Sequence, residues 1–160
     1  MISNRHLKYL LRGFMRLTSF TDFGLRALMR LAAEPARSFT TDEIASEFSI
    51  SRNHLAKVVR DLAAHGFVLT QRGSGGGFRL AGAPEEIVIG HVVRSLESKQ
   101  ALVECFRADG GHCALTPKCR LKARLAKARD AFLRELDAMT LAECFYPAPD
   151  KDDAAGLAAP

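Results

Sequence analysis

The sequence contains no tryptophan and only two tyrosines among 160 residues, and aromatic side chains account for 8% of the chain. This scarcity argues against an aromatic sugar-binding surface and against an aromatic belt at a membrane. No apolar run approaches the roughly eighteen residues that a transmembrane helix requires, so we expect no membrane partner. Hydrophobic residues at 48% and charged residues at 26% predict a folded, globular chain instead.

Cysteine is absent before residue 105. Cys105, Cys113 and Cys119 then fall within fifteen residues, and Cys144 stands alone. A secreted disulfide framework would spread an even number of cysteines along the chain behind a signal peptide. The N-terminal residues show neither a long apolar core nor a small-residue cleavage site, so we expect a cytoplasmic protein. Grouped cysteines in such a protein indicate metal binding or redox chemistry.

Acidic residues are scarce in the first half of the chain. Residues 1–80 carry twelve Lys and Arg against six Asp and Glu, whereas residues 81–160 carry eleven against twelve. The chain as a whole has a formal net charge of +5. A basic N-terminal half is typical of a protein with a polyanionic partner such as nucleic acid. Ordinary solvated surface charge is the alternative interpretation.

The first half also shows the periodicity of a small helical domain. Apolar spacing predicts three helices and two short strands, over residues 20–33, 40–48, 52–65, 67–71 and 78–81. Their expected helix caps are Thr21 with Asp22, Thr40 with Glu43, and Ser51. A tight turn joins the last two helices, and a glycine-rich run separates the strands as in a hairpin. The pattern predicts a winged helix-turn-helix, mainly α-helical with one small β-hairpin.

The second half is predicted to hold a fourth helix from Pro84 to about Ser98, an irregular loop over 99–118, and one long helix from Cys119 to about Glu143. Apolar residues line one face of the long helix, at Leu121, Leu125, Ala128, Phe132, Leu136 and Met139. We interpret it as a dimerisation helix, because it is too long and too exposed for the core of a small monomer.

Four regions are therefore expected along the chain. Residues 1–14 form a basic extension, or reflect a start codon assigned too early, since a second methionine follows at Met15. Residues 15–83 form the DNA-binding domain. Residues 84–146 contain the cysteine loop and the dimerisation helix, and the Ala/Pro/Asp-rich residues 147–160 form a disordered tail.

The helix over 52–65 is the expected recognition helix, because the first side chains of such a helix meet base edges in the major groove. Arginine pairs with guanine and asparagine with adenine, whereas cations further along the helix and on the wing suit phosphates. The candidate DNA-contacting residues are Arg52, Asn53, His54, Lys57, Arg60, Arg72 and Arg79. Each could instead belong to a solvated face.

No enzyme chemistry is expected. The glycine-rich run lacks the Gly-Lys-Ser/Thr ending of a P-loop, which excludes nucleotide binding there. The sequence also shows no paired carboxylates and no nucleophile with its base placed for turnover.

The three grouped thiols can hold an iron–sulfur cluster or a zinc ion, and both usually require a fourth ligand. Candidates for that ligand are His112, Cys144 and a carboxylate from elsewhere. His112 directly precedes Cys113, an awkward spacing for two ligands of one ion. A thiol–disulfide switch remains a further possibility.

The chain resembles the Rrf2 class of winged-helix regulators in two segments, MRLTSFTDFGLRALMR at 15–30 and SRNHLAKVVRDLAAHGFVLTQRGSGGGFRL at 51–80. Within that class it is similar to the NsrR group of nitric-oxide-sensing repressors, in LVECF at 102–106 and CALTPKCRLKARLAKARDAFLRELDAMTLAEC at 113–144. The resemblance covers residues 15–144.

This resemblance implies a homodimeric repressor of a palindromic operator in double-stranded DNA. It implies an iron–sulfur cluster held by Cys105, Cys113 and Cys119, with a carboxylate near the start of the first helix, here Asp22, donated by the other subunit. Nitrosylation of that iron–sulfur cluster is then the signal that releases the DNA.

Two departures from the pattern bear on the type of iron–sulfur cluster. The gap between Cys105 and Cys113 exceeds the usual spacing by about the Gly110–Gly111 pair. Lys122 stands where cluster-assembly regulators of the class have a histidine, which favours 4Fe–4S over 2Fe–2S. Iron-responsive regulators of the RirA type have a similar loop, so iron availability is the alternative signal. A zinc-stabilised DNA-binding or interaction module is a third interpretation.

Overall fold

The computed structural model describes residues 17–71, 73, 76–98, 100–116 and 118–146. The predicted extension 1–14 and the predicted tail 147–160 therefore lie outside the described residues. The helices and strands of the first part are α2 (Ser19–Ala33), α3 (Thr41–Glu47), α4 (Arg52–Ala64), β1 (Val68–Gln71) and β2 (Gly77–Leu80). The strands pair antiparallel, with Val68 opposite Leu80 and Gln71 opposite Gly77. This order confirms the winged helix-turn-helix.

The helix starts follow local capping chemistry, with one correction. Helix α2 begins earlier than expected, so its N-cap is Thr18, whose hydroxyl accepts a hydrogen bond from the Thr21 amide at 3.2 Å. Thr21 and Asp22 lie inside the first turn instead of capping it. The predicted capping box of Thr40 and Glu43 is confirmed at the start of α3. Ser51 is the N-cap residue of α4, but its side chain makes no capping hydrogen bond.

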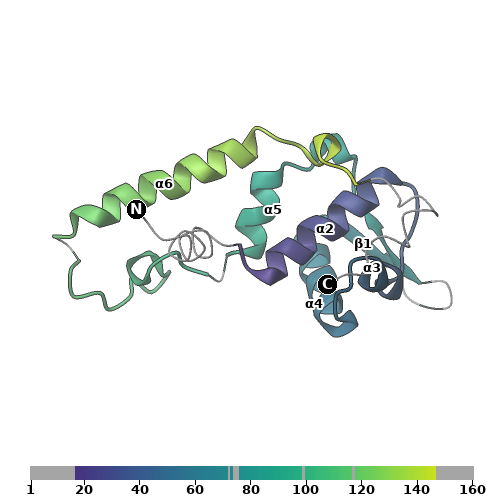
Figure 1. The fold of residues 1–160 in the computed structure, drawn as a ribbon, viewed down its shortest axis with the longest axis horizontal. Helices are drawn as coiled ribbons and strands as arrows, with labels where there is room; N and C mark the ends of the chain where they lie inside the picture. Colours follow the sequence, from purple (N-terminus) through teal and green to yellow (C-terminus); the bar gives the residue numbers. More distant parts are fainter. Residues whose placement is uncertain (1–16, 72, 74–75, 99, 117, 147–160) are drawn as a thin grey trace, which may run out of the picture.

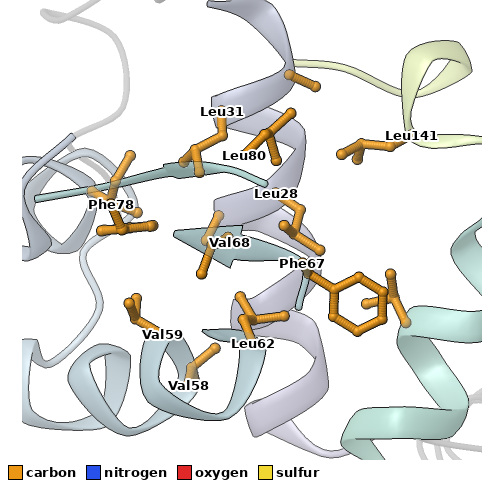
Figure 2. Close-up of a cluster of buried hydrophobic side chains, with 14 of the residues drawn as sticks. Leu28, Leu31, Val58, Val59, Leu62, Phe67, Val68, Phe78, Leu80 and Leu141 are labelled. Atoms are coloured by element: carbon orange, nitrogen blue, oxygen red, sulfur yellow. The ribbon is translucent and has the colours of Figure 1, made fainter. Parts of the chain in front are cut away.

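The core lies between α2, α4 and the hairpin, where Leu28, Leu31, Val58, Leu62 and Val68 pack together (Figure 2). Two buried aromatic residues connect the wing to the segment that precedes α3. Phe39 and Phe78 exchange backbone hydrogen bonds of 2.9 and 2.8 Å. The wing is therefore fixed to the helix-turn-helix by backbone as well as by side chains.

The second part differs from prediction at two points. The single helix expected from Pro84 is a 3₁₀ turn, η1 (Pro84–Glu86), followed by the shorter α5 (Ile89–Leu96). The long helix α6 (Arg120–Asp137) ends before Glu143, and a 3₁₀ turn, η3 (Leu141–Glu143), follows.

The physical reason for both breaks is a backbone pairing between residues that are distant in the sequence. Val88 and Thr140 form an antiparallel bridge, and the Leu141 amide donates to the Ile87 carbonyl at 2.8 Å. This pairing places Leu141 in the core, fully buried. Neither segment could remain helical and form the bridge.

Helix α6 extends away from the winged domain and carries no buried residue (Figure 1). Only its C-terminal half packs against the core, through Phe132, Leu133 and Leu136. Arg94 of α5 pairs with Asp137 at this end and lowers the pKa of that carboxyl. No helix among the described residues has the length and apolarity needed to cross a bilayer.

Candidate DNA-binding surface and cysteine loop

Helix α4 presents one buried face and one exposed, basic face. Leu55, Val58, Val59 and Leu62 are buried, which turns the opposite side of the helix to solvent. The predicted DNA-contacting residues on this helix are all exposed, namely Arg52, Asn53, His54, Lys57 and Arg60. The structure thus gathers five of the seven predicted DNA contacts on one accessible face.

Arg52 already has a partner in the free protein. Its Nε lies 2.6 Å from an Asp42 carboxylate oxygen at the start of α3, and both side chains are exposed. Because exposed ion pairs contribute little to stability, this contact can open at low cost when DNA approaches.

The tight turn predicted between α3 and α4 is confirmed at Ser49, which has a φ of 52°.

The wing contributes Arg79, which is exposed on β2, whereas Arg72 lies outside the described residues. The glycine at position 77 has a packing role within the fold. A Cβ there would lie 2.5 Å from the Phe39 carbonyl oxygen. Gly77 therefore permits the backbone contact between the wing and Phe39.

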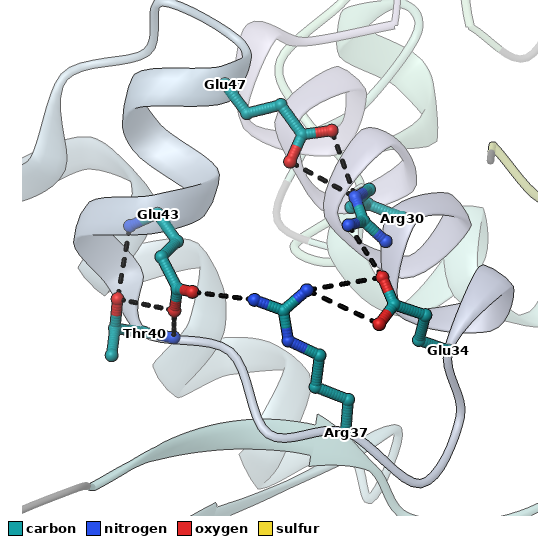
Figure 3. Close-up of polar contacts among 6 residues, drawn as sticks. All are labelled: Arg30, Glu34, Arg37, Thr40, Glu43 and Glu47. Atoms are coloured by element: carbon teal, nitrogen blue, oxygen red, sulfur yellow. Dashed lines mark hydrogen bonds and ion pairs between the residues drawn. The ribbon is translucent and has the colours of Figure 1, made fainter. Parts of the chain in front are cut away.

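A charged network that the sequence analysis missed holds α3 in place (Figure 3). Arg30 is only 3% exposed and pairs with Glu47 at 3.0 Å and with Glu34 at 2.8 Å. Arg37 bridges Glu34 and Glu43 at 3.2 and 2.9 Å. The spacing of Arg30 and Glu34, four residues apart, is the local signal that could have indicated part of it.

Hydrogen bonds and nearby arginines lower the pKa values of two carboxyl groups in this network, Glu34 and Glu43. The hydrogen bond from Arg30 lowers the pKa of Glu34, and Arg37 lowers it further. The pKa of Glu43 is lowered mainly by the Thr40 backbone amide and hydroxyl of the capping box. The guanidinium carbons of Arg30 and Arg37 lie 4.6 and 4.2 Å from the centre of the Phe39 ring. The network therefore joins α2 to α3 and packs against Phe39, whose backbone pairs with the wing at Phe78.

The cysteine loop, defined here as residues 98–119, connects α5 to α6 at the far end of the molecule from the hairpin (Figure 1). Cys105 lies in a 3₁₀ turn, η2 (Glu104–Phe106), and Cys119 is the N-cap residue of α6. Cys105, Cys113 and Cys119 are free thiols and half-buried. In the part of the chain that the structure describes, no three Cys, His, Asp or Glu side chains converge as metal ligands do.

The other candidate ligands lie in ordinary surroundings. Asp22 is in the first turn of α2, where its side chain is 45% exposed and pairs with Arg26 at 2.9 Å. His112 is exposed. Cys144 lies at the end of η3 and packs against the core, and its thiol donates to the Thr140 and Leu141 carbonyls. Burial raises the pKa of Cys144, which disfavours the thiolate that binds metal.

A winged helix-turn-helix with an exposed basic helix α4 is the architecture of a DNA-binding regulator. The chain belongs to the Rrf2 family, whose model is described as an iron-dependent transcriptional regulator and matches residues 17–146. This finding confirms the resemblance inferred from the sequence.

Named relatives agree with this assignment. The chain is 51% identical to the HTH-type transcriptional regulator NsrR of Geobacillus kaustophilus, over 81% of this chain and 88% of the relative. Among solved structures, oxidized CymR of Staphylococcus aureus matches with a TM-score of 0.63 and 26% identity, over 84% of this chain and 100% of that one. IscR of T. potens matches with a TM-score of 0.63 at 23% identity, over 92% and 95%, which supports the fold alone.

Proposed function

We propose that this regulator is a repressor that senses nitric oxide through an iron–sulfur cluster and releases its operator in response. The observation that carries the proposal is the 51% identity to NsrR over 81% of the chain. The family match over residues 17–146 includes both the recognition helix and all three loop cysteines.

The donor set fits an iron–sulfur cluster in its chemistry. Cys105, Cys113 and Cys119 are free thiols on one loop, and thiolates are the usual ligands of iron–sulfur clusters. Such an iron–sulfur cluster, proposed as 4Fe–4S, supplies iron that reacts with nitric oxide. Asp22 of the partner subunit is the proposed fourth ligand. Because a carboxylate is a harder ligand than a thiolate, its iron should be the most labile.

The proposed DNA-binding unit is a homodimer on a palindromic operator, with one α4 for each half-site. Arg52, Asn53 and His54, exposed at the start of α4, are the proposed contacts to base edges. Lys57 and Arg60, exposed further along α4, are the proposed contacts to phosphates. Arg79, with Arg72, extends this surface along the wing. The exposed face of α6 supports the dimer, since Leu121 is 61% exposed in the single chain.

The direct test is iron, sulfide and zinc analysis of protein purified without oxygen. We expect iron and sulfide with a brown chromophore, and their loss in Cys105→Ser, Cys113→Ser and Cys119→Ser. Cys144→Ser is the matched control and should keep both. Zinc alone with a colourless protein, or equal loss in Cys144→Ser, would refute the proposed site.

The ligand role of Asp22 requires its own variant. Asp22→Ala should alter the visible spectrum and the response to nitric oxide, whereas Arg26→Ala, which removes only the ion-pair partner, should alter neither. An unchanged spectrum and response in Asp22→Ala would remove Asp22 from the ligand set.

Iron availability is a second candidate signal, because the matching family model is described as iron-dependent. In that case loss of iron, and not reaction with nitric oxide, would release the operator. Comparing release by a chelator with release by nitric oxide separates the two signals.

A further inference from the structure

The last residue before the cysteine loop is hydrogen-bonded to the start of α2. A Glu97 carboxylate oxygen accepts hydrogen bonds from both the backbone amide and the hydroxyl of Thr18, each at 2.8 Å. The two residues are 79 positions apart in the sequence. Thr18 is also the N-cap of α2, and its hydroxyl contacts that of Thr21, which is fully buried. One carboxylate oxygen thus holds the cap that begins α2.

Glu97 lies where the loop meets the rest of the fold. It is the C-cap residue of α5, and the cysteine loop begins at the next position. Across the described part of the loop, hydrogen bonds stay local: the Gln100 amide donates to Glu97, the His112 amide to Glu104, and Arg107 to Asp109. The loop also contacts α6, where the guanidinium carbon of Arg129 lies 5.1 Å from the centre of the Phe106 ring. At the winged domain, a change in the conformation of the loop acts through Glu97, which directly precedes the loop and holds Thr18.

The next step runs from α2 to the recognition helix. Gly24 is buried where α2 crosses both α5 and α4. A Cβ at Gly24 would lie 2.6 Å from Leu96 Cδ1 and 3.5 Å from Val58 Cγ1. Leu96 directly precedes Glu97, and Val58 belongs to the buried face of α4. Because packed interiors have little free volume, a shift of the first turn of α2 must displace these neighbours.

We propose that Glu97 is a positioning residue that couples the state of the cysteine loop to the placement of α2 and, through Gly24, of α4. The coupling rests on the proposed function in one respect, namely that the loop holds the iron–sulfur cluster. Glu97 acts here as a hydrogen-bond acceptor for Thr18 and not as a metal ligand.

The first experiment compares operator affinity of iron-loaded protein with that of the same protein after chelation, by fluorescence anisotropy. Allosteric coupling of ordinary size changes affinity by about 5- to 150-fold, and we expect a ratio in this range for the wild type. Glu97→Ala should keep its iron but reduce the ratio to below about twofold. Glu97→Gln retains an accepting oxygen and should keep the ratio, as should Glu85→Ala, which removes an exposed carboxylate elsewhere.

Three results of this experiment would contradict either the role of Glu97 or the proposed function, and each can be told from the others. If Glu97→Ala keeps both its iron and the wild-type ratio, Glu97 does not couple the loop to α4. If Glu97→Ala loses its iron, Glu97 acts on metal retention and the positioning role is wrong. If the wild type itself holds no iron, the proposed function fails, and the second experiment decides on Glu97.

The second experiment measures amide hydrogen exchange on cluster-free protein, so its result does not depend on bound metal. Glu97→Ala removes the carboxylate oxygen that accepts from Thr18. Hydrogen exchange in this variant should be about fivefold faster or more at the Thr21 and Asp22 amides, and also faster along α4. Glu97→Gln and Glu85→Ala should exchange like the wild type. Faster exchange confined to the first turn of α2, with α4 unchanged, would show a local cap only and overturn the inference.

Discussion

At the scale of single residues, Arg30 shows most clearly what tertiary structure adds to sequence. Its guanidinium is buried between the carboxylates of Glu34 and Glu47 and above the ring of Phe39. Apolar periodicity predicts helix α2 but gives no reason to bury an arginine within it. Glu34 lies on the same helix, whereas Glu47 is brought close only by the packing of α3 against α2.

Arg30→Ala should lower the free energy of unfolding by about 1.5 to 3 kcal/mol, because it removes the hydrogen bonds of a buried guanidinium to the Glu47 carboxylate, whereas Glu34 keeps Arg37 as a partner. Arg26→Ala is the matched control, since Arg26 pairs with Asp22 on the exposed side of the same helix. Its effect should stay within about 0.5 kcal/mol. Urea denaturation measures both, and equal effects would contradict the structural role assigned to the network.

The capping box of α3 predicts a specific dependence of stability on pH. The Thr40 amide and hydroxyl hold the pKa of Glu43 below the ordinary value of 4.5. A carboxyl whose pKa is lowered in the folded state stabilises the protein above the unfolded-state pKa and loses that contribution as pH falls through the folded-state pKa. The stability difference between wild type and Glu43→Gln should therefore be full above pH 4.5 and shrink below it.

Thermal unfolding of both proteins across that pH range measures this difference. Glu85→Gln, at an exposed position, should differ little from the wild type at any pH. A Glu43→Gln difference that stays constant down to strongly acidic pH would show that the carboxylate charge does not stabilise α3.

At the scale of elements, local patterns predicted the three helices and the hairpin of the winged domain, because capping and apolar spacing operate within a few residues. They failed where long-range backbone pairing decides the outcome. The bridge between Val88 and Thr140 shortens both α5 and α6, and no local signal at either position indicates it. The exposed residues of α4 were predicted together because helical spacing alone places them on one face.

The proposed base contact of Arg52 and the proposed phosphate contact of Lys57 can be distinguished by substitution. Arg52→Ala should reduce the preference for operator over random DNA, because a base contact is worth about 1 to 3 kcal/mol of discrimination. Lys57→Ala should weaken binding to both DNAs alike and lower the salt dependence by about one counterion. Anisotropy titrations at several salt concentrations measure these effects. Equal losses on both DNAs for Arg52→Ala would argue against base contact.

At the scale of the whole molecule, the cysteine loop lies at one end, and α5 lies between it and the winged domain that carries α4 (Figure 1). The sequence predicted both the loop and α4, since each is contained in a short segment. It could not place the ligands relative to one another, because an irregular loop has no periodicity from which to predict its conformation. The proposed fourth ligand, moreover, belongs to the partner subunit. Within the described residues of one chain, the three cysteines do not converge as metal ligands do.

The apolar face of α6 predicts that the chain dimerises through it. Leu121→Glu should raise the dimer dissociation constant by at least about tenfold, because it places a charge in the apolar contact. Ala123→Glu introduces the same charge two residues along, on the opposite side of the helix, and should leave the dimer intact. Sedimentation equilibrium distinguishes them. A Leu121→Glu protein that remains as dimeric as the wild type would place the interface elsewhere.

Nitric oxide sensing is tested by titrating the iron-loaded protein on its operator with nitric oxide, without oxygen, while DNA anisotropy is recorded. We expect the anisotropy to fall to the value of free DNA as nitric oxide is added. Retention of the DNA through the titration, with release only when a chelator removes the iron, would contradict nitric oxide sensing and establish iron as the signal.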